Sequence, residues 1–184
     1  LMRQVKAFEA FAKDVPKSAT QEISLVYDPF TPRALLQALI ATMAQRNTRL
    51  SLINASRDEA ESLLANGQAD LGICQARHRS VGDAMEWRAL GAIEMDFYAA
   101  KALFPGAEQP LSLLELSLTP QVIMHPDSDE PVARRLQISG HTIFTNELEM
   151  LRALLEQGCG WGFLPTHMHA EQWENVNTLR TEVG

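Results

Sequence analysis

One order of elements occurs twice in this sequence, and it restricts the fold more than any other feature. Its later copy spans residues 145–167, TNELEMLRALLEQGCGWGFLPTH. Asn146 and Glu149 have the spacing of a capping box, and leucines then recur at helical spacing. Gly158 stands where a left-handed C-cap would end the helix, and Trp161–Leu164 follows as a short apolar strand. The copy is therefore a helix, a glycine and a strand.

The earlier copy spans residues 56–74, SRDEAESLLANGQADLGIC, and has the same order. Ser56 and Glu59 form its capping box, and Gly67 ends its helix. Leu71–Cys74 is its strand. Two units of one design predict an α/β protein with two similar halves.

The region before the earlier copy extends the pattern. Ile23–Tyr27 and Leu50–Ile53 are predicted strands, and a helix separates them. Thr31 and Pro32 predict where this helix begins, because proline favours the first helical position after a capping residue. Strand, helix, strand, helix and strand in this order predict a parallel sheet with right-handed crossovers.

Composition excludes several classes of protein. The 184 residues are 46% hydrophobic and 21% charged, as in ordinary globular proteins. The net charge of −7 makes this chain by itself a poor DNA binder. No apolar run approaches the ~20 residues of a membrane span, and the first 15 residues lack the apolar block of a signal peptide. Cys74 and Cys159 are too few for a disulfide scaffold, which favours reduced thiols in a cytoplasmic protein.

Polar residues follow several of the predicted strands. Ligands of open α/β sheets bind beyond the carboxyl ends of the strands, where helix N-termini attract polar or anionic groups. Thr31, Ser56 and Asn146 begin helices there, and the Gln75–Ala76 turn and the His125–Ser128 loop also follow strands. If the two halves face each other, all five would line one cleft. The alternative is that the three helix starts only cap their helices, at about 1 kcal/mol each.

Signals for catalysis or metal binding are weak. His125 and Ser128 lack the Gly-x-Ser-x-Gly elbow of a hydrolase. His167 and His169 would diverge on a helix, which favours surface histidines over metal ligands. The glycines of 158–162 follow a helix and precede a strand, the reverse of a dinucleotide-binding loop. We therefore expect no enzyme activity, metal or cofactor.

Two segments carry a resemblance to a known family. They are LLANGQADLGI at residues 63–73 and LEMLRALLEQGCGWGFLPTH at residues 148–167, and the helix start at Thr31 and Pro32 adds to them. Together they resemble the effector-binding (co-inducer) domain of LysR-type transcriptional regulators, over roughly residues 23–173. The resemblance implies two Rossmann-like lobes of the periplasmic-binding-protein type (type 2). Crossover strands would join the lobes, with a ligand cleft between them.

The resemblance also implies a domain plan. Residues 1–20 would be the end of a linker helix and a linker, residues 21–96 the first lobe, and residues 97–184 the second lobe. The return segment of the first lobe and the family's N-terminal helix-turn-helix domain are expected to be absent from this chain. Contact with DNA is then expected only through that missing domain. The family further implies a homodimer or homotetramer, with no membrane partner.

The implied function is ligand sensing for a bacterial transcription factor, with a small metabolite as effector. Residues of the first lobe that match the family's pocket are Phe30, Thr31, Ser56, Arg57, Gln75 and Ala76. Residues of the second lobe that match it are His125, Asp127, Ser128, Thr145 and Asn146. Positive Arg57 and a histidine beside Asp127 leave the charge of the ligand open. The alternatives are a solute-binding protein of a transport system and, third, a small enzyme on the same fold.

Overall fold

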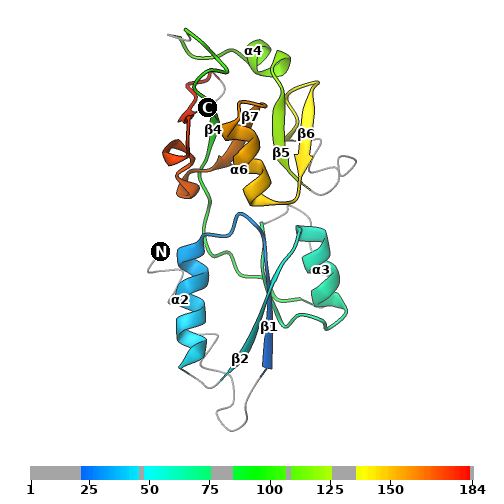
Figure 1. Cartoon of the computed structure of the whole chain (residues 1–184). Helices are drawn as coiled ribbons and strands as arrows, with labels where there is room; N and C mark the ends of the chain where they lie inside the picture. The colour runs from blue at the N-terminus through cyan, green and yellow to red at the C-terminus, as the bar shows by residue number, and fades with distance from the viewer. Residues whose placement is uncertain (1–21, 46–47, 76–84, 107–108, 126–135, 183–184) are drawn as a thin grey trace. The chain divides into compact units, whose positions relative to one another are not determined.

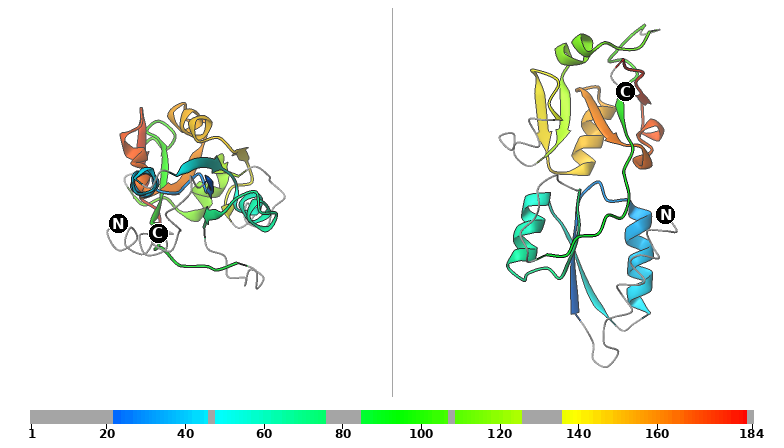
Figure 2. Two further views of the ribbon diagram at one scale, coloured as in Figure 1. Left: turned by 90° about the horizontal axis from the view of Figure 1, so that it is seen from below. Right: turned by 180° about the vertical axis from the view of Figure 1, so that it is seen from behind.

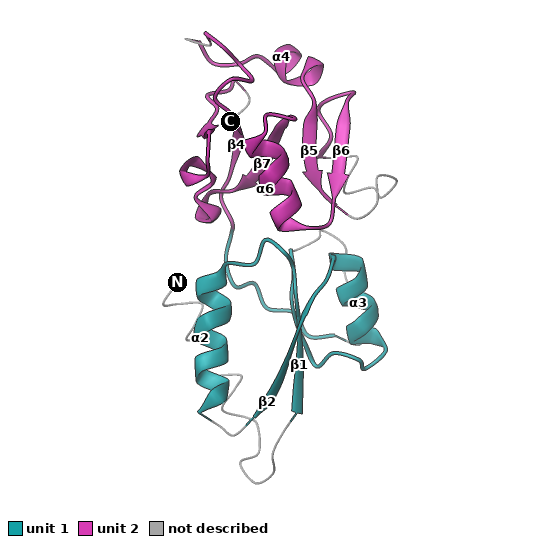
Figure 3. Ribbon diagram, viewed as in Figure 1, with its two compact units in different colours: residues 1–92 teal, residues 93–184 magenta. Residues whose placement is uncertain are grey.

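The chain divides into two compact units, residues 1–92 and residues 93–184 (Figures 1 and 3). The computed structural model describes residues 22–45, 48–75, 85–106, 109–125 and 136–182. The linker helix expected within residues 1–20 lies outside these ranges. Each unit has its own sheet and its own buried side chains, so each is described by itself.

Unit 1 is built on three parallel strands. They are β1 (Glu22–Tyr27), β2 (Arg49–Asn54) and β3 (Leu71–Ile73), in the order β2-β1-β3. Helix α2 (Arg33–Ala44) connects β1 to β2, and α3 (Arg57–Ala65) connects β2 to β3. The predicted alternation of strands and helices and the parallel sheet are confirmed.

The two helices cover opposite faces of this sheet (Figures 1 and 2). Successive residues of a strand point to opposite faces, and β1 shows this at Leu25 and Val26. Leu25 packs with Leu36 and Leu39 of α2, whereas Val26 packs with Ala60 of α3. The central strand is therefore buried on both sides, which explains its nearly continuous apolar sequence.

Helix α3 begins and ends as its sequence predicts. The Glu59 N–H donates to Ser56 Oγ at 3.4 Å, and the Ser56 N–H donates to Glu59 Oε2 at 2.9 Å, which completes the capping box. Gly67 has a φ of +67°, and the Gln68 N–H donates to the Leu63 carbonyl at 2.8 Å. This is a Schellman motif, which favours glycine because the left-handed conformation strains other residues.

The later copy ends in the same way. Helix α6 (Leu148–Glu156) is followed by Gly158 at a φ of +71°, and the Cys159 N–H donates to the Leu154 carbonyl at 2.9 Å. Strand β7 (Trp161–Pro165) begins two residues further on. The doubled helix, glycine and strand order is thus confirmed, with one type of helix end in both units.

Unit 2 contains a mixed sheet of five strands in the order β6-β5-β7-β4-β8. The new strands are β4 (Met95–Ala100), β5 (Gln121–Met124), β6 (Thr142–Thr145) and β8 (Val176–Thr178). Strand β5 runs parallel to β6 and β7, whereas β4 runs antiparallel to β7 and β8. Unit 2 therefore also presents the carboxyl ends of parallel strands at one edge.

Side chains alternate across β7 to build the core of unit 2. Gly162 lies against Leu155 of α6, and Trp161 points to the opposite face. There Trp161 packs with Phe97 and with Leu116 of α4 (Leu113–Leu118). The chain after β7 forms two short 3₁₀ turns. They are η1 (Thr166–Met168) and η2 (Ala170–Gln172).

A buried glutamine connects β5 to the backbone of the segment before β6. Gln121 is 1% exposed, and its Nε2 donates to the Leu136 carbonyl at 2.8 Å. Its Oε1 accepts the N–H groups of Ile138 and Ser139 at 2.8 and 3.1 Å. One side chain thereby fixes three backbone groups of the segment that leads into β6. Throughout the described ranges, every helix is too short or too polar to cross a membrane.

Candidate functional site

The carboxyl ends of β1, β2 and β3 meet at one edge of the unit 1 sheet because the strands are parallel. Backbone hydrogen bonds extend beyond the strands there. The Asp28 N–H donates to the Ile73 carbonyl at 2.9 Å, and the Ala55 N–H donates to the Tyr27 carbonyl at 3.2 Å. The residues that follow each strand are therefore held beside one another. Six of the eleven predicted site residues follow these strands, and the structure describes five of them: Phe30, Thr31, Ser56, Arg57 and Gln75.

The loop after β1 holds Phe30 and Thr31. The Phe30 N–H donates to Asp28 Oδ1 at 2.7 Å, which tightens the turn. Thr31 is 4% exposed, and its hydroxyl donates to the Ile73 carbonyl at 3.5 Å. The prediction that Thr31 caps the next helix is wrong, because Pro32 is the N-cap residue of α2 and no side chain caps that end. Thr31 is turned toward the end of β3 instead.

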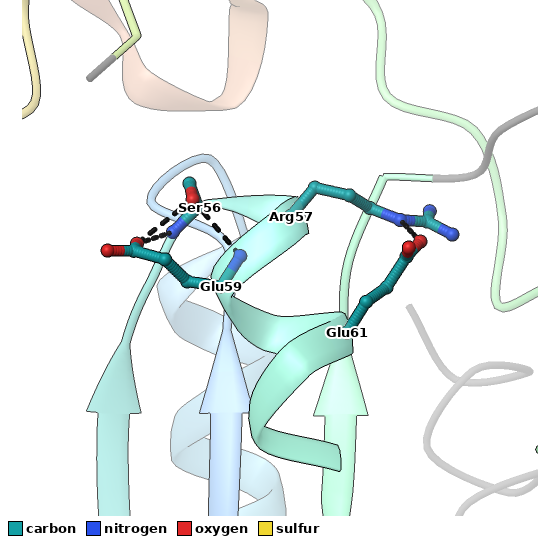
Figure 4. Close-up of polar contacts among 4 residues, drawn as sticks. All are labelled: Ser56, Arg57, Glu59 and Glu61. Atoms are coloured by element: carbon teal, nitrogen blue, oxygen red, sulfur yellow. Dashed lines mark hydrogen bonds and ion pairs between the residues drawn. The ribbon is translucent and has the colours of Figure 1, made fainter. Parts of the chain in front are cut away.

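After β2 come Ser56, the N-cap of α3, and Arg57, its first residue. Figure 4 shows their polar contacts. Ser56 caps α3, and its hydroxyl also donates to Glu59 Oε2 at 2.9 Å. Arg57 is buried, and its Nε donates to Glu61 Oε1 at 2.5 Å. The guanidinium carbon of Arg57 lies 4.7 Å from the centre of the Trp87 ring, an arrangement typical of a cation–π contact. Ser56 is thus engaged in capping, whereas Arg57 is a buried residue with an ion-pair partner, Glu61, and an aromatic partner, Trp87.

The third strand end is marked by Cys74 and Gln75. Burial raises the pKa of the Cys74 thiol to about 11, and the positive charge of Arg57 opposes part of that rise. The thiol is therefore neutral at physiological pH. Gln75 is exposed and Ala76 lies outside the described residues.

Unit 2 brings a second set of predicted residues together. Met124 at the end of β5 is paired with Thr145 at the end of β6, so His125 and Asn146 follow paired positions. His125 is half-buried and Asn146 is exposed. The other predicted residues of this loop, Asp127 and Ser128, lie outside the ranges that the structure describes.

The start of α6 differs from its prediction. Its N-cap residue is Glu147, and no side chain accepts a hydrogen bond from the helix there. The prediction of a capping box formed by Asn146 and Glu149 is therefore wrong. The Glu147 N–H donates instead to Thr145 Oγ1 at 3.2 Å, and this turn moves the helix start two residues beyond the asparagine.

The structure adds three residues to the edge of unit 1 that the sequence-based prediction missed: Glu61, Cys74 and Trp87. The spacing of Arg57 and Glu61 is a signal for an ion pair on a helix. Trp87 lies 30 positions after Arg57, and no periodicity connects them. In the described part of the chain, no group of three or more His, Cys, Asp or Glu residues is arranged to hold a metal ion.

Comparison with known proteins identifies the family. The sequence matches the LysR substrate binding domain over residues 16–182. No curated protein matches the chain. Solved structures are similar to it. One is HinK, a LysR family transcriptional regulator from Pseudomonas aeruginosa, which is 19% identical with a TM-score of 0.61. The match covers 98% of this chain and 65% of that one.

Two further structures are effector-binding domains. That of BenM, solved with its effector benzoate, is 15% identical with a TM-score of 0.67, and the match covers 90% of this chain and 79% of that one. That of QuiR, in complex with shikimate, is 17% identical with a TM-score of 0.66, over 90% and 83% of the two chains. At these identities the structures show the fold alone, which is the type 2 periplasmic-binding-protein-like α/β fold. The match to the family model shows more: the chain belongs to the LysR substrate binding domain family, and it is a ligand-sensing regulatory domain.

Proposed function

We propose that a small-molecule effector binds at the carboxyl edge of the unit 1 sheet. The observation that carries this proposal is the convergence of three strand ends, each followed by a different kind of binding group. Phe30 offers apolar contact, Arg57 offers a guanidinium and Gln75 offers an exposed amide. The N-terminus of α3 adds its positive dipole end to the same edge.

The ligands of two relatives support a small molecule as the effector. BenM binds benzoate and QuiR binds shikimate, and both ligands are small organic acids. His125, Thr145 and Asn146 lie at the matching edge of unit 2, where parallel strands also end. That these residues touch the same ligand as unit 1 stays a prediction.

The effector would act through the whole regulator. We infer that binding favours one arrangement of the protein and so changes how its DNA-binding domains engage DNA; a ligand that bound all arrangements equally would change nothing. The net charge of −7 supports DNA contact through another domain rather than through this one. A homodimer or homotetramer in the cytoplasm is the assembly that membership of this family supports.

Two rival functions have less support. The matched family is a regulatory one, and neither HinK, BenM nor QuiR is described as a transport protein. Catalysis is also disfavoured, because Ser56 is engaged in capping and Cys74 is a neutral thiol at physiological pH.

A thermal-shift screen against small metabolites tests the proposal. A ligand at 100 times its Kd adds about 2.7 kcal/mol to the free energy of unfolding. Thr31→Ala removes the hydroxyl that joins the loop of Phe30 to the end of β3. We expect this variant and Asn146→Asp to remove the shift of a hit while the protein stays folded.

Matched controls lie away from the strand ends. Thr42→Ala removes a hydroxyl that bonds to the Ala38 carbonyl on α2, and Asn177→Asp changes an exposed side chain on β8. Both control variants should keep the full shift. Equal shifts in all four variants would exclude the proposed edge.

A further inference from the structure

We propose that the Arg57 guanidinium makes the effector site selective for ligands that carry a carboxylate. This inference rests on the proposed function, because it names the chemical class of ligand for the same edge of unit 1. Its basis is one buried nitrogen atom whose hydrogen bonds the described protein does not complete.

That atom is Nη1 of Arg57. The residue is only 8% exposed, and Nη1 is buried with no hydrogen-bond partner among the described residues. Buried polar groups nearly always have a partner, and an unpaired donor on a charged group costs more free energy than one on a neutral group. Arg57 therefore retains the capacity to bind an acceptor from outside the chain.

An arginine in unit 2 has the same kinds of partner but is not buried, so this arrangement of side chains does not by itself require burial. Arg152 on α6 pairs through Nε with Glu156, four residues later, at 2.7 Å, and its guanidinium carbon lies 5.6 Å from the centre of the Trp173 ring. Arg57 has the same kind of partners in Glu61 and Trp87. The difference is exposure, since the Arg152 side chain is 45% exposed and water can complete its hydrogen bonds.

Neighbouring groups leave the role of acceptor open. Glu61 already binds the Nε of Arg57, and Asp28 already accepts the Phe30 N–H. The Cys74 thiol is neutral at physiological pH, so it offers no negative charge. A ligand can supply the acceptor that Nη1 lacks among the described residues. A carboxylate suits it best, because charge-assisted hydrogen bonds to a planar guanidinium are the strongest and most directional available.

Trp87 lies next to this guanidinium. Its ring lies over the guanidinium, yet the side chain is 42% exposed and its segment, residues 85–94, is outside any strand or helix. A cation–π contact at such a site is weak compared with a charge-assisted hydrogen bond. A ligand can therefore move the ring and take the place beside Nη1.

The test uses pairs of ligands that differ only in charge. A panel of small carboxylates that includes benzoate and shikimate is compared with the corresponding carboxamides by thermal shift and calorimetry. Wild-type protein should bind its best acid at least about tenfold more tightly than the matching amide, as expected for a charge-assisted bond. Arg57→Met should reduce this preference to less than about twofold, whereas Arg152→Met should leave it unchanged.

Distinct outcomes overturn the inference and the proposed function. A preference for the acid that survives in Arg57→Met, or equal binding of acid and amide by wild-type protein, refutes the role of Arg57 while the binding site stands. Failure of every acid, amide and neutral metabolite to bind at the unit 1 edge refutes the proposed function itself. If Arg57→Met does not fold, the ¹⁵N resonances of the Arg57 side chain in wild-type protein decide instead: the acid should shift them and the amide should not. Unmoved resonances on binding of an acid refute the inference.

Discussion

The buried side chain of Gln121 provides the sharpest test of how unit 2 is held together. We expect Gln121→Met, which keeps the volume but loses every polar atom, to lower the free energy of unfolding of this unit. Its three hydrogen bonds, of 2.8, 2.8 and 3.1 Å, join β5 to the backbone of residues 136–139. The N–H of Ser139 is buried, and leaving it unpaired costs about 2 kcal/mol; the two less buried bonds add roughly 0.5 kcal/mol each. The expected loss is about 3 kcal/mol.

The matched control is Gln137→Met. Gln137 is exposed, and it makes one hydrogen bond, to the Ser139 carbonyl at 3.0 Å. Its loss should cost no more than about 0.5 kcal/mol.

Urea unfolding followed by tryptophan fluorescence measures both variants. The chain has three tryptophans, so a Trp87→Phe background leaves only Trp161 and Trp173, both in unit 2. Equal costs for Gln121→Met and Gln137→Met would show that Gln121 does not hold this segment.

Three further perturbations test single features. A Cβ at Gly160 would lie 2.6 Å from the Pro120 carbonyl oxygen, so Gly160→Ala should cost about 2–3 kcal/mol in urea unfolding, whereas Gly140→Ala meets nothing within 4 Å and should cost little. Ser112→Ala removes the capping box of α4 and should cost about 1 kcal/mol by the same measurement. The raised pKa of Cys74 means that its thiol ionises first in the unfolded chain, so stability should fall as pH rises from about 9 to about 11, and Cys74→Ala should abolish that part of the fall; an unchanged pH profile would contradict the assignment.

Local sequence signals predicted most of the framework. Helix ends were predictable where one residue type satisfies a specific backbone need, as at Gly67 and Gly158 in the left-handed conformation. The parallel order in unit 1 followed from apolar strands that alternate with amphipathic helices. These signals act over a few residues, which is why a single sequence reveals them.

Helix starts were less predictable because capping side chains have other partners available. Thr31 and Asn146 both stand in positions that suit a cap, yet neither caps a helix. The Thr31 hydroxyl donates to the Ile73 carbonyl, 42 residues away. A sequence pattern cannot show that a strand end from elsewhere competes for the same hydroxyl.

The candidate site was predictable in outline but not in detail. Position after a strand was enough to select Phe30, Ser56, Arg57 and Gln75. It could not show that Arg57 is buried or that Trp87 lies over its guanidinium, since no local pattern connects two residues 30 positions apart. The burial and the partners of the Arg57 guanidinium are thus known only from the structure.

The central claim is that a small effector binds where the parallel strands end, and NMR mapping tests it most directly. A ¹⁵N-labelled sample is titrated with a hit from the metabolite screen, and amide shifts are followed along the chain. We predict the largest changes at residues 28, 30, 31, 54–57 and 73–75, together with changes at residues 145–147. Changes confined to other parts of the chain, with these amides unmoved at saturation, would contradict the account.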